Sequence, residues 1–279
     1  DMDLVDLFIG AEGTLGVVTD ITLTLLPGPD SINGLTAFFD AEQAALEFVR
    51  FLRSGLAARP TAIEYFDGNA LDLLRRMKAE NPAFSELPLL KPELHTALYF
   101  EFEGDVPDPV IEKAEDAVEC WFSEGEREIE ALKNFRHAIP ESVNLLVAER
   151  KKTVPELTKL GTDMAVPDER LEEVMRMYHQ GLAAAELEYV IFGHIGNNHV
   201  HVNILPRSME EYEKGRALYL DWAKQVVAWG GSVSAEHGIG KSKTDFLKLM
   251  YGEAGITEMK RLKALFDPFG LLNRGNLFV

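Results

Sequence analysis

Tyr189-Val-Ile-Phe-Gly-His194-Ile-Gly-Asn-Asn-His199-Val-His201-Val-Asn-Ile204 is the stretch that decides the fold. Its β-branched and aromatic residues predict two short strands, at 190–192 and 200–204, joined into a hairpin by the polar turn at 196–198. Helical periodicity precedes the hairpin over 168–187 and follows it over 209–229. A hairpin enclosed by two helices indicates one half of an α+β sheet.

The residues before this hairpin carry a similar succession of elements, although the sequence itself is not visibly repeated. Alternation of Ile21, Leu23 and Leu25 predicts a strand near the start of the chain, and a short strand is expected at 232–235. The other expected elements are strands at 34–39, 61–65 and 94–102 and helices at 41–54, 69–80 and 109–123. Two such sets predict an α+β fold, with a mostly antiparallel sheet and helices on one side.

Composition narrows the class of protein. The 279 residues are 46% hydrophobic, and no apolar run approaches the roughly 20 residues of a membrane-spanning helix. The net charge of -18 argues against nucleic acid as a partner, because phosphate binding needs a basic face. Much of the acid lies at 112–130 and reads as a solvated helix face. The single cysteine, Cys120, forms no internal disulfide, which fits a cytoplasmic protein. Peripheral association with a membrane is left open.

The hairpin and a second motif concentrate the reactive side chains. His194, His199 and His201 fall within eight residues, and Glu236-His237 follows on glycine-rich backbone. Isolated histidines usually serve as hydrogen-bonding groups, but this set also offers the nitrogen and oxygen donors that zinc-like ions prefer, with a base beside them. Two histidines and one carboxylate would leave coordination positions for a substrate. On spacing alone, His199 competes with its neighbours as a ligand.

The start of the chain is harder to interpret. Glu12-Gly13-Thr14-Leu-Gly16 forms either an ordinary tight turn or a backbone cradle for a cofactor, and the residues alone leave both open. The chain begins at Asp1 without an initiator methionine or a signal peptide, which is typical of an excised fragment.

Four motifs in order resemble one known family. They are Glu12-Gly-Thr-Leu-Gly-Val, His194-x-Gly-Asn-x-x-x-His201, Glu236-His237-Gly-Ile-Gly and Phe266-Asp-Pro-Phe-Gly-Leu-Leu-Asn273-Arg-Gly275. They are similar to the FAD-linked oxidases of the vanillyl-alcohol-oxidase superfamily. Within it they are most similar to the group of D-lactate dehydrogenase, glycolate oxidase and D-2-hydroxyglutarate dehydrogenase.

This resemblance implies a domain organisation. Residues 1–29 would be the C-terminal remnant of an FAD-binding domain, 30–265 a substrate-binding cap with ferredoxin-like halves, and 266–279 a segment that returns to the FAD domain. FAD would be bound mainly by a domain that precedes residue 1, so the chain alone would be inactive. Its expected partners are that domain, a small 2-hydroxy-acid substrate and an electron acceptor that the sequence does not name, and homodimer formation is left open.

The resemblance also implies roles for individual residues. His194, His201 and Glu236 would bind a divalent metal ion, for which the donor set favours zinc, and His237 would be the catalytic base. Arg136 would pair with the substrate carboxylate. The residues implied to face the cofactor are Glu12, Gly13, Thr14, Gly16 and Asn273. Whether the α-hydrogen leaves as a hydride or the base removes it as a proton is left open.

The sequence departs from the family pattern at the distal end of the substrate. Asn197-Asn198-His199 replaces the usual Asp-Gly-Asn, which directs an extra histidine, His199, towards the substrate. Pro140 occupies the place of a threonine and Gly161 that of a substrate-binding lysine, and Lys159 or Lys151 is the candidate to replace that lysine. A small monocarboxylate such as D-lactate or glycolate is therefore favoured over a dicarboxylate. The alternatives are a flavin-independent metal-binding or partner-docking module and, with less support, a metal-dependent hydrolase.

Overall fold

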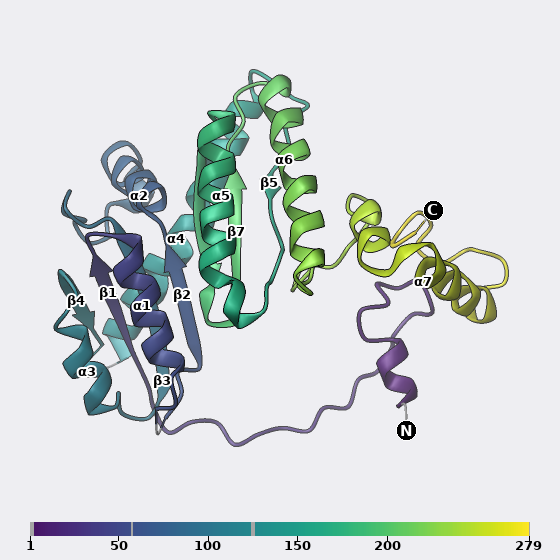
Figure 1. Ribbon diagram of the computed structural model, residues 1–279. Coiled ribbons are helices and arrows are strands. Elements are labelled where there is room, and N and C mark those ends of the chain that lie inside the picture. Colours follow the sequence, from purple (N-terminus) through teal and green to yellow (C-terminus); the bar gives the residue numbers. More distant parts are fainter. Residues whose placement is uncertain (1–2, 57, 124–125, 279) are drawn as a thin grey trace. The chain divides into compact units, whose positions relative to one another are not determined.

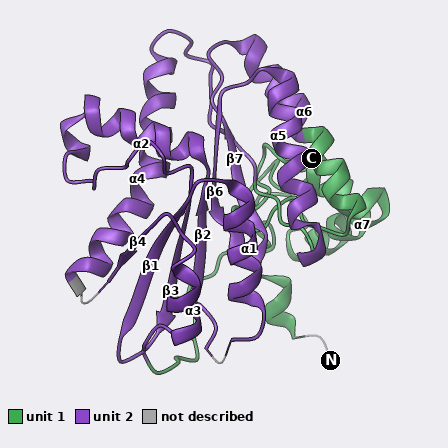
Figure 2. Ribbon diagram, turned by 60° about the vertical axis from the view of Figure 1, so that its left-hand side comes forward, with its two compact units in different colours: residues 1–27, 163–167, 220–279 green, residues 28–162, 168–219 purple. Residues whose placement is uncertain are grey.

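The computed structural model describes residues 3–56, 58–123 and 126–278 and divides them into two compact units (Figure 2). Unit 1 combines residues 1–27, 163–167 and 220–279, and unit 2 combines residues 28–162 and 168–219. The boundary at 27/28 falls near the expected one at 29/30. The grouping of 220–265 with the two ends of the chain differs from the single expected cap at 30–265, and those domain limits stay a proposal.

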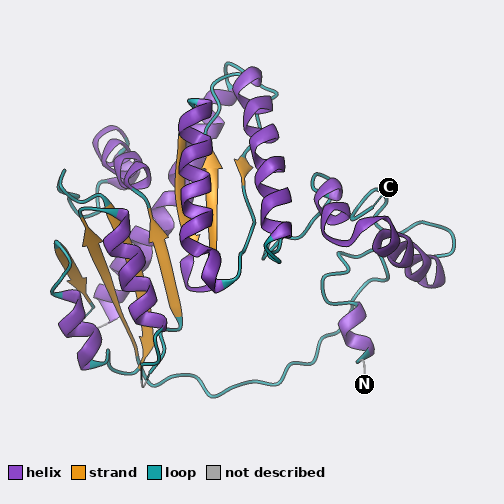
Figure 3. Cartoon of the chain, viewed as in Figure 1, coloured by secondary structure: helices purple, strands orange, loops and turns teal. Residues whose placement is uncertain are grey.

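The elements follow one another as a mixed α+β chain (Figure 3). The strands are β1 (Ile32–Phe39), β2 (Ala62–Phe66), β3 (Thr96–Glu103), β4 (Glu119–Phe122), β5 (Leu160–Gly161), β6 (Tyr189–His194) and β7 (His199–Ile204). The α-helices are α1 (Glu42–Arg53), α2 (Gly68–Glu80), α3 (Asp108–Ala114), α4 (Glu126–Lys151), α5 (Leu171–Ala185), α6 (Met209–Ala228) and α7 (Thr244–Phe266). Short 3-10 helices are η1 (Leu4–Leu7), η2 (Pro82–Phe84), η3 (Asp168–Arg170) and η4 (Ile195–Asn197).

All seven strands form one antiparallel sheet in unit 2, in the order β4-β1-β3-β2-β6-β7-β5. The first four strands have the 4-1-3-2 order of a ferredoxin-like half, and β6-β7-β5 repeats the 2-3-1 part of that order. The halves join where β2 pairs with β6, at Phe66 opposite Phe192. The expected α+β class, antiparallel sheet and ferredoxin-like halves are confirmed.

Helices cover both faces of this sheet. On one face, Phe48 of α1 packs against Phe39 and Phe100, and α5 lies on the same side (Figure 1). This is the arrangement expected from the sequence. On the opposite face, Phe135 of α4 packs against Phe38 and Phe66. Helices α2 and α4 thus add a second layer on this face of the sheet.

Three expected elements differ from those observed. The helix expected at 109–123 ends at Ala114, and Cys120-Trp121-Phe122 instead belongs to β4, paired with β1. An apolar stripe of so few residues suits a helix or a strand, and the open edge of β1 selects the strand. The expected strand at 232–235 is reduced to a single bridge between Ser232 and Ala165.

The third difference concerns the alternating segment near the start of the chain. Residues 17–30 contain no strand, and among the described residues no segment pairs with them in a sheet. Ile21, Leu23 and Leu25 are exposed, because an alternating sequence forms a strand only where a partner edge is present. Elsewhere in unit 1, α7 is interrupted at Gly252, whose φ of 64° breaks the helix. No helix in the described part of the chain is long and apolar enough to cross a membrane.

Candidate active site

The hairpin of β6 and β7 gathers the three predicted histidines in unit 2. His194 lies directly opposite His199 in the sheet, and His201 lies opposite Phe192. The ring centroids are 4.5 Å apart for His199 and His201, 5.6 Å for His194 and His199, and 5.8 Å for His194 and His201. Gly193 makes this packing feasible, since a Cβ there would lie 2.7 Å from Cδ2 of His201.

A buried carboxylate that the sequence analysis missed connects two of the predicted residues. Glu64 of β2 accepts a hydrogen bond from Nδ1 of His194 at 2.8 Å. The same carboxylate forms an ion pair with Arg136 of α4 at 2.7 Å. The side chain of Glu64 is only 5% exposed. Arg136 and His194 are thereby brought together on one carboxylate. The sequence contained one sign of this role, because Glu64 is a charged residue in the middle of the strand expected at 61–65.

The hydrogen bonds of His194 and His201 select the nitrogen that could bind a metal. Nδ1 of His201 donates to the carbonyl of Thr162 at 2.9 Å, and Nδ1 of His194 donates to Glu64. Each ring therefore presents Nε2 as its coordinating atom, with an outer partner that fixes the ring and increases its basicity. This donor set fits a zinc-like ion.

The same face of β7 carries two further polar residues. His199 is buried beside His201, and Asn203 is buried two residues further along the strand. Oδ1 of Asn203 has no hydrogen-bond partner in the described part of the chain, so this atom could accept a hydrogen bond from a ligand. Lys159 is exposed and precedes β5, whose Gly161 pairs with Asn203. Asn203 was missed, although its same-face spacing from His199 and His201 could have identified it.

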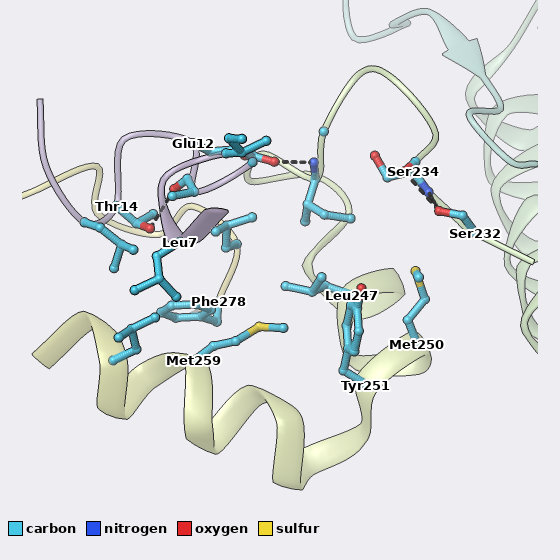
Figure 4. Close-up of a pocket in the computed structure, with 18 of the residues that line it drawn as sticks. Leu7, Glu12, Thr14, Ser232, Ser234, Leu247, Met250, Tyr251, Met259 and Phe278 are labelled. Atoms are coloured by element: carbon cyan, nitrogen blue, oxygen red, sulfur yellow. Dashed lines mark hydrogen bonds between the residues drawn. The ribbon is translucent and has the colours of Figure 1, made fainter. Parts of the chain in front are cut away.

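Glu236 and His237 lie in unit 1, where they line a cavity of about 770 Å³. Its remaining walls are mostly apolar and include Leu247, Met250 and Tyr251 (Figure 4). His237 is largely exposed, and its Nε2 lies 3.1 Å from a carboxylate oxygen of Glu236. A mainly apolar hollow with a histidine at its rim fits a flat aromatic ring system such as that of a flavin.

The residues expected to face the cofactor also gather in unit 1. Gly13 adopts a positive φ of 70°, Thr14 is buried, and the side-chain amide of Asn273 donates to the carbonyl of Glu12 at 2.6 Å. Gly16 lies near Phe8. The two ends of the chain therefore meet within this unit. The carboxylate of Glu12 itself is engaged by backbone amides of the His237 loop, at Ile239 and Gly240.

Residues 29–277 match the family "FAD linked oxidases, C-terminal domain". The chain belongs to this family. The membership confirms the resemblance drawn from the four motifs.

Among curated relatives, the chain is 27% identical to the glycolate oxidase subunit GlcD of Bacillus subtilis, over 99% of the chain and 57% of that protein. It is 30% identical to D-2-hydroxyglutarate dehydrogenase of Stutzerimonas stutzeri, over 99% of the chain and 59% of the relative. It is 28% identical to D-lactate dehydrogenase of Anaerostipes hadrus, over 98% and 58%. The chain thus spans less than two-thirds of the length of these relatives.

Solved structures share the fold at lower identity. The 4-ethylphenol oxidase from Gulosibacter chungangensis superposes with a TM-score of 0.58 at 19% identity, over 92% of this chain and 55% of that one. An alkyldihydroxyacetonephosphate synthase gives a TM-score of 0.60 at 15% identity, over 98% and 49%. These similarities support the α+β architecture.

Proposed function

We propose that this chain is the substrate-binding and catalytic part of an FAD-dependent dehydrogenase that oxidises a D-2-hydroxy acid to the 2-oxo acid. The observation that carries the proposal is Glu64, which holds His194 and Arg136 to one buried carboxylate. A 2-hydroxy acid needs a cationic partner for its carboxylate and an activating group for its adjacent hydroxyl. Membership of the FAD-linked oxidase family supports a redox reaction with FAD as the cofactor.

For the hydroxyl end of the substrate, His194, His201 and Glu236 are the proposed metal ligands, and His237 is the proposed base. A bound zinc-like ion would lower the pKa of a coordinated hydroxyl. His237 would accept the hydroxyl proton at its imidazole, and a bound flavin would supply the two-electron acceptor. Hydride and carbanion routes use the same residues.

For the carboxylate end, Arg136 would bind the substrate, with His199 and Lys159 closing the distal side. His199 narrows the space and Gly161 brings no ammonium group, so D-lactate or glycolate is the proposed substrate. The proposed flavin-facing segment contains Glu12, Gly13, Thr14, Gly16 and Asn273. The proposed partners are an FAD-binding domain joined before residue 1 and a separate electron acceptor. The proposal also includes a homodimer and a cytoplasmic location, and it leaves peripheral membrane association open.

The test uses the protein expressed from its complete coding sequence. We expect a yellow flavin spectrum and dye reduction by D-lactate or glycolate in preference to D-2-hydroxyglutarate, with activity lost after chelation and restored by zinc. A colourless protein, or one that no 2-hydroxy acid reduces, would reject the proposal. A colourless protein that retains stoichiometric metal would favour the flavin-independent metal-binding module instead.

The metal ligands have their own test. Elemental analysis of His201→Ala should show loss of the metal found in the unaltered protein. His137→Ala, which removes an exposed histidine of the same unit, is the matched control and should retain it. Equal metal content in His201→Ala and the unaltered protein would remove His201 from the ligand set.

A further inference from the structure

We infer that Asp163 and Glu12 are positioning residues that hold the loop of residues 234–240 from its two ends, and so fix the proposed base His237. This inference rests on the proposed function, because it assumes that His237 acts on the substrate. The geometry itself lies entirely within unit 1 and does not depend on the reaction.

Asp163 holds the first part of the loop. Its Oδ1 accepts the backbone N–H of Glu236 at 3.2 Å, and its Oδ2 accepts the backbone N–H of His237 at 3.2 Å and the hydroxyl of Ser234 at 2.9 Å. Asp163 is only 2% exposed. One buried carboxylate therefore binds the main chain of the proposed metal ligand and of the proposed base together.

A lysine balances the charge of this buried group. Nζ of Lys243 lies 2.7 Å from Oδ2 of Asp163, and the lysine side chain is itself mostly buried. A cation beside a buried carboxylate offsets the cost of burying it, and charge-assisted hydrogen bonds are about twice as strong as neutral ones. Lys243 directly precedes α7, so the balancing charge comes from the start of that helix.

Glu12 holds the second part of the loop from a distant part of the sequence. Its Oε1 accepts the N–H of Ile239 at 2.6 Å, and its Oε2 accepts the N–H of Gly240 at 2.8 Å and the side-chain amide of Asn276 at 2.6 Å. Gly238 lies directly under this carboxylate, since a Cβ there would come within 2.6 Å of Oε1. Glu12 therefore fits tightly only over a glycine.

The loop needs these anchors because it contains no helix or strand. Gly238 and Gly240 have φ values of 71° and 61°, so regular backbone hydrogen bonding cannot continue through them. The four backbone amides at 236, 237, 239 and 240 are instead satisfied by two carboxylates. Displacement of a catalytic group by about 1 Å can lower a rate by about 100-fold, so the anchors should affect turnover more than substrate binding.

Amide hydrogen exchange, followed residue by residue by NMR, tests the anchors without an activity assay. Asp163→Asn should accelerate exchange at Glu236 and His237 by about 10- to 100-fold and leave Ile239 and Gly240 unchanged. Glu12→Gln should produce the reverse pattern. The matched control is Asp267→Asn, because Asp267 also accepts two backbone amides and a lysine in this unit, at Leu271, Leu272 and Lys263.

Asp267→Asn should affect the amides of 271 and 272 alone. Unchanged protection at 236 and 237 in Asp163→Asn, or a uniform increase throughout the unit with a lower Tm, would overturn the inference. If Asp163→Asn does not fold, Glu12→Gln carries the same test for 239 and 240.

Kinetics of the protein expressed from its complete coding sequence then test the consequence. Asp163→Asn should retain the visible flavin spectrum, and both variants should lose about 100-fold in kcat with KM changed by less than about threefold. A KM effect alone, or an unchanged kcat, would overturn the positioning role. If the unaltered protein oxidises no 2-hydroxy acid, the proposed function fails, and the exchange experiment still decides whether the two carboxylates anchor the loop.

Discussion

At the scale of a single residue, Gly193 determines how closely the hairpin histidines pack. Its φ of 132° is strained for any other residue, and a Cβ would lie 2.7 Å from His201. We expect Gly193→Ala to lower the free energy of unfolding by about 2–4 kcal/mol, from backbone strain and displacement of the ring. Urea unfolding of the altered and unaltered chains measures the difference.

The control for this substitution is Gly55→Ala in the same unit. Gly55 also has a positive φ, of 93°, but nothing lies within 4 Å of an added Cβ. It should cost only about 1 kcal/mol, because strain acts there without a clash. Equal losses for the two variants would show that the contact with His201 contributes nothing to stability.

Residues recognised by their chemical type could be predicted from the sequence, whereas their partners could not. His194 and Arg136 are separated by 58 positions in the chain, yet both contact Glu64, which belongs to a third segment. No local pattern specifies such a contact, because it depends on how β2, β6 and α4 assemble. Asp163 escaped notice for the same reason, since its partners lie more than 70 residues away.

At the scale of elements, the turn of the histidine hairpin is held by α1 and by η3, the short helix that precedes α5. Asn198 adopts a left-handed backbone with φ 53°. Its side-chain carbonyl oxygen accepts a hydrogen bond from Arg53 at 2.6 Å, and its side-chain amide donates one to Asp168 at 2.7 Å. Arg53 also pairs with Asp168. We expect Arg53→Met to destabilise the chain by about 1 kcal/mol, since the pair is partly solvated.

A double-mutant cycle with Asn198→Gly separates the two contributions of Arg53. Glycine adopts the left-handed backbone without side-chain support, so Arg53→Met should cost clearly less in the glycine background than in the unaltered chain. The coupling energy from thermal or urea unfolding should be about 0.5–1 kcal/mol. Additive losses would mean that Arg53 acts only through Asp168.

Helices α1 and α5 are also joined by a titratable pair that predicts the pH dependence of stability. Nε2 of His179 lies 2.5 Å from Glu42, which also accepts from Tyr65. The hydrogen bond to Glu42 raises the pKa of His179 above its usual value despite partial desolvation. Burial raises the pKa of nearby Asp67 to about 7. In both cases the folded chain retains a proton that the unfolded chain releases at lower pH.

Stability should therefore decrease as the pH rises from about 6 to 8, because the folded state binds more protons over this interval. The stabilisation that protonated His179 provides is complete at pH values below its pKa in the unfolded chain. It is lost as the pH rises through its pKa in the folded chain. Glu42→Gln should flatten this slope and remove about 1 kcal/mol near pH 6. Glu47→Gln, an exposed change on the same helix, is the control. The same slope in Glu42→Gln and the unaltered chain would contradict the assignment.

The regular elements around these contacts were predictable where periodicity was long. The helices at 41–54 and 168–187 and the histidine hairpin agree with α1, α5 and the β6–β7 pair to within a few residues. The strand β4 was not predicted, because Cys120-Trp121-Phe122 becomes a strand only when β1 offers an edge. Tertiary pairing thus decides the short segments, whereas local pattern decides the long ones.

At the scale of the whole molecule, the sequence predicted a fold class and a family, but its domain limits do not coincide with the compact units. Unit 1 is assembled from three segments of the chain, and unit 2 from two. The five residues 163–167 lie in unit 1 between long segments of unit 2. Nothing in the composition of 163–167 indicates that these residues belong to unit 1. Their place in unit 1 depends on contacts such as that of Asp163 with the His237 loop.

The alternating segment at 17–31 gives a prediction for the molecule as a whole. Its residues form no strand, and Leu23, Leu25 and Leu26 are 72%, 84% and 87% exposed. Exposed, unpaired backbone is where proteases cut first. We therefore expect limited chymotrypsin digestion of the 279-residue chain to cut first after Leu23 and Leu25, because Pro27 blocks cleavage after Leu26, and mass spectrometry to identify the sites.

The same segment should behave differently if, as proposed, it continues an FAD-binding domain. In the protein expressed from its complete coding sequence, the alternating residues would pair with that domain, and cleavage at 23–26 should slow by about 10-fold or more, since protection follows the free energy of local opening. Leu89 is exposed in the loop between η2 and β3 of unit 2 and serves as an internal reference site. Equal cleavage at 23–26 in the two proteins would show that this segment is a linker, and would contradict the proposed remnant of a flavin domain at 1–29.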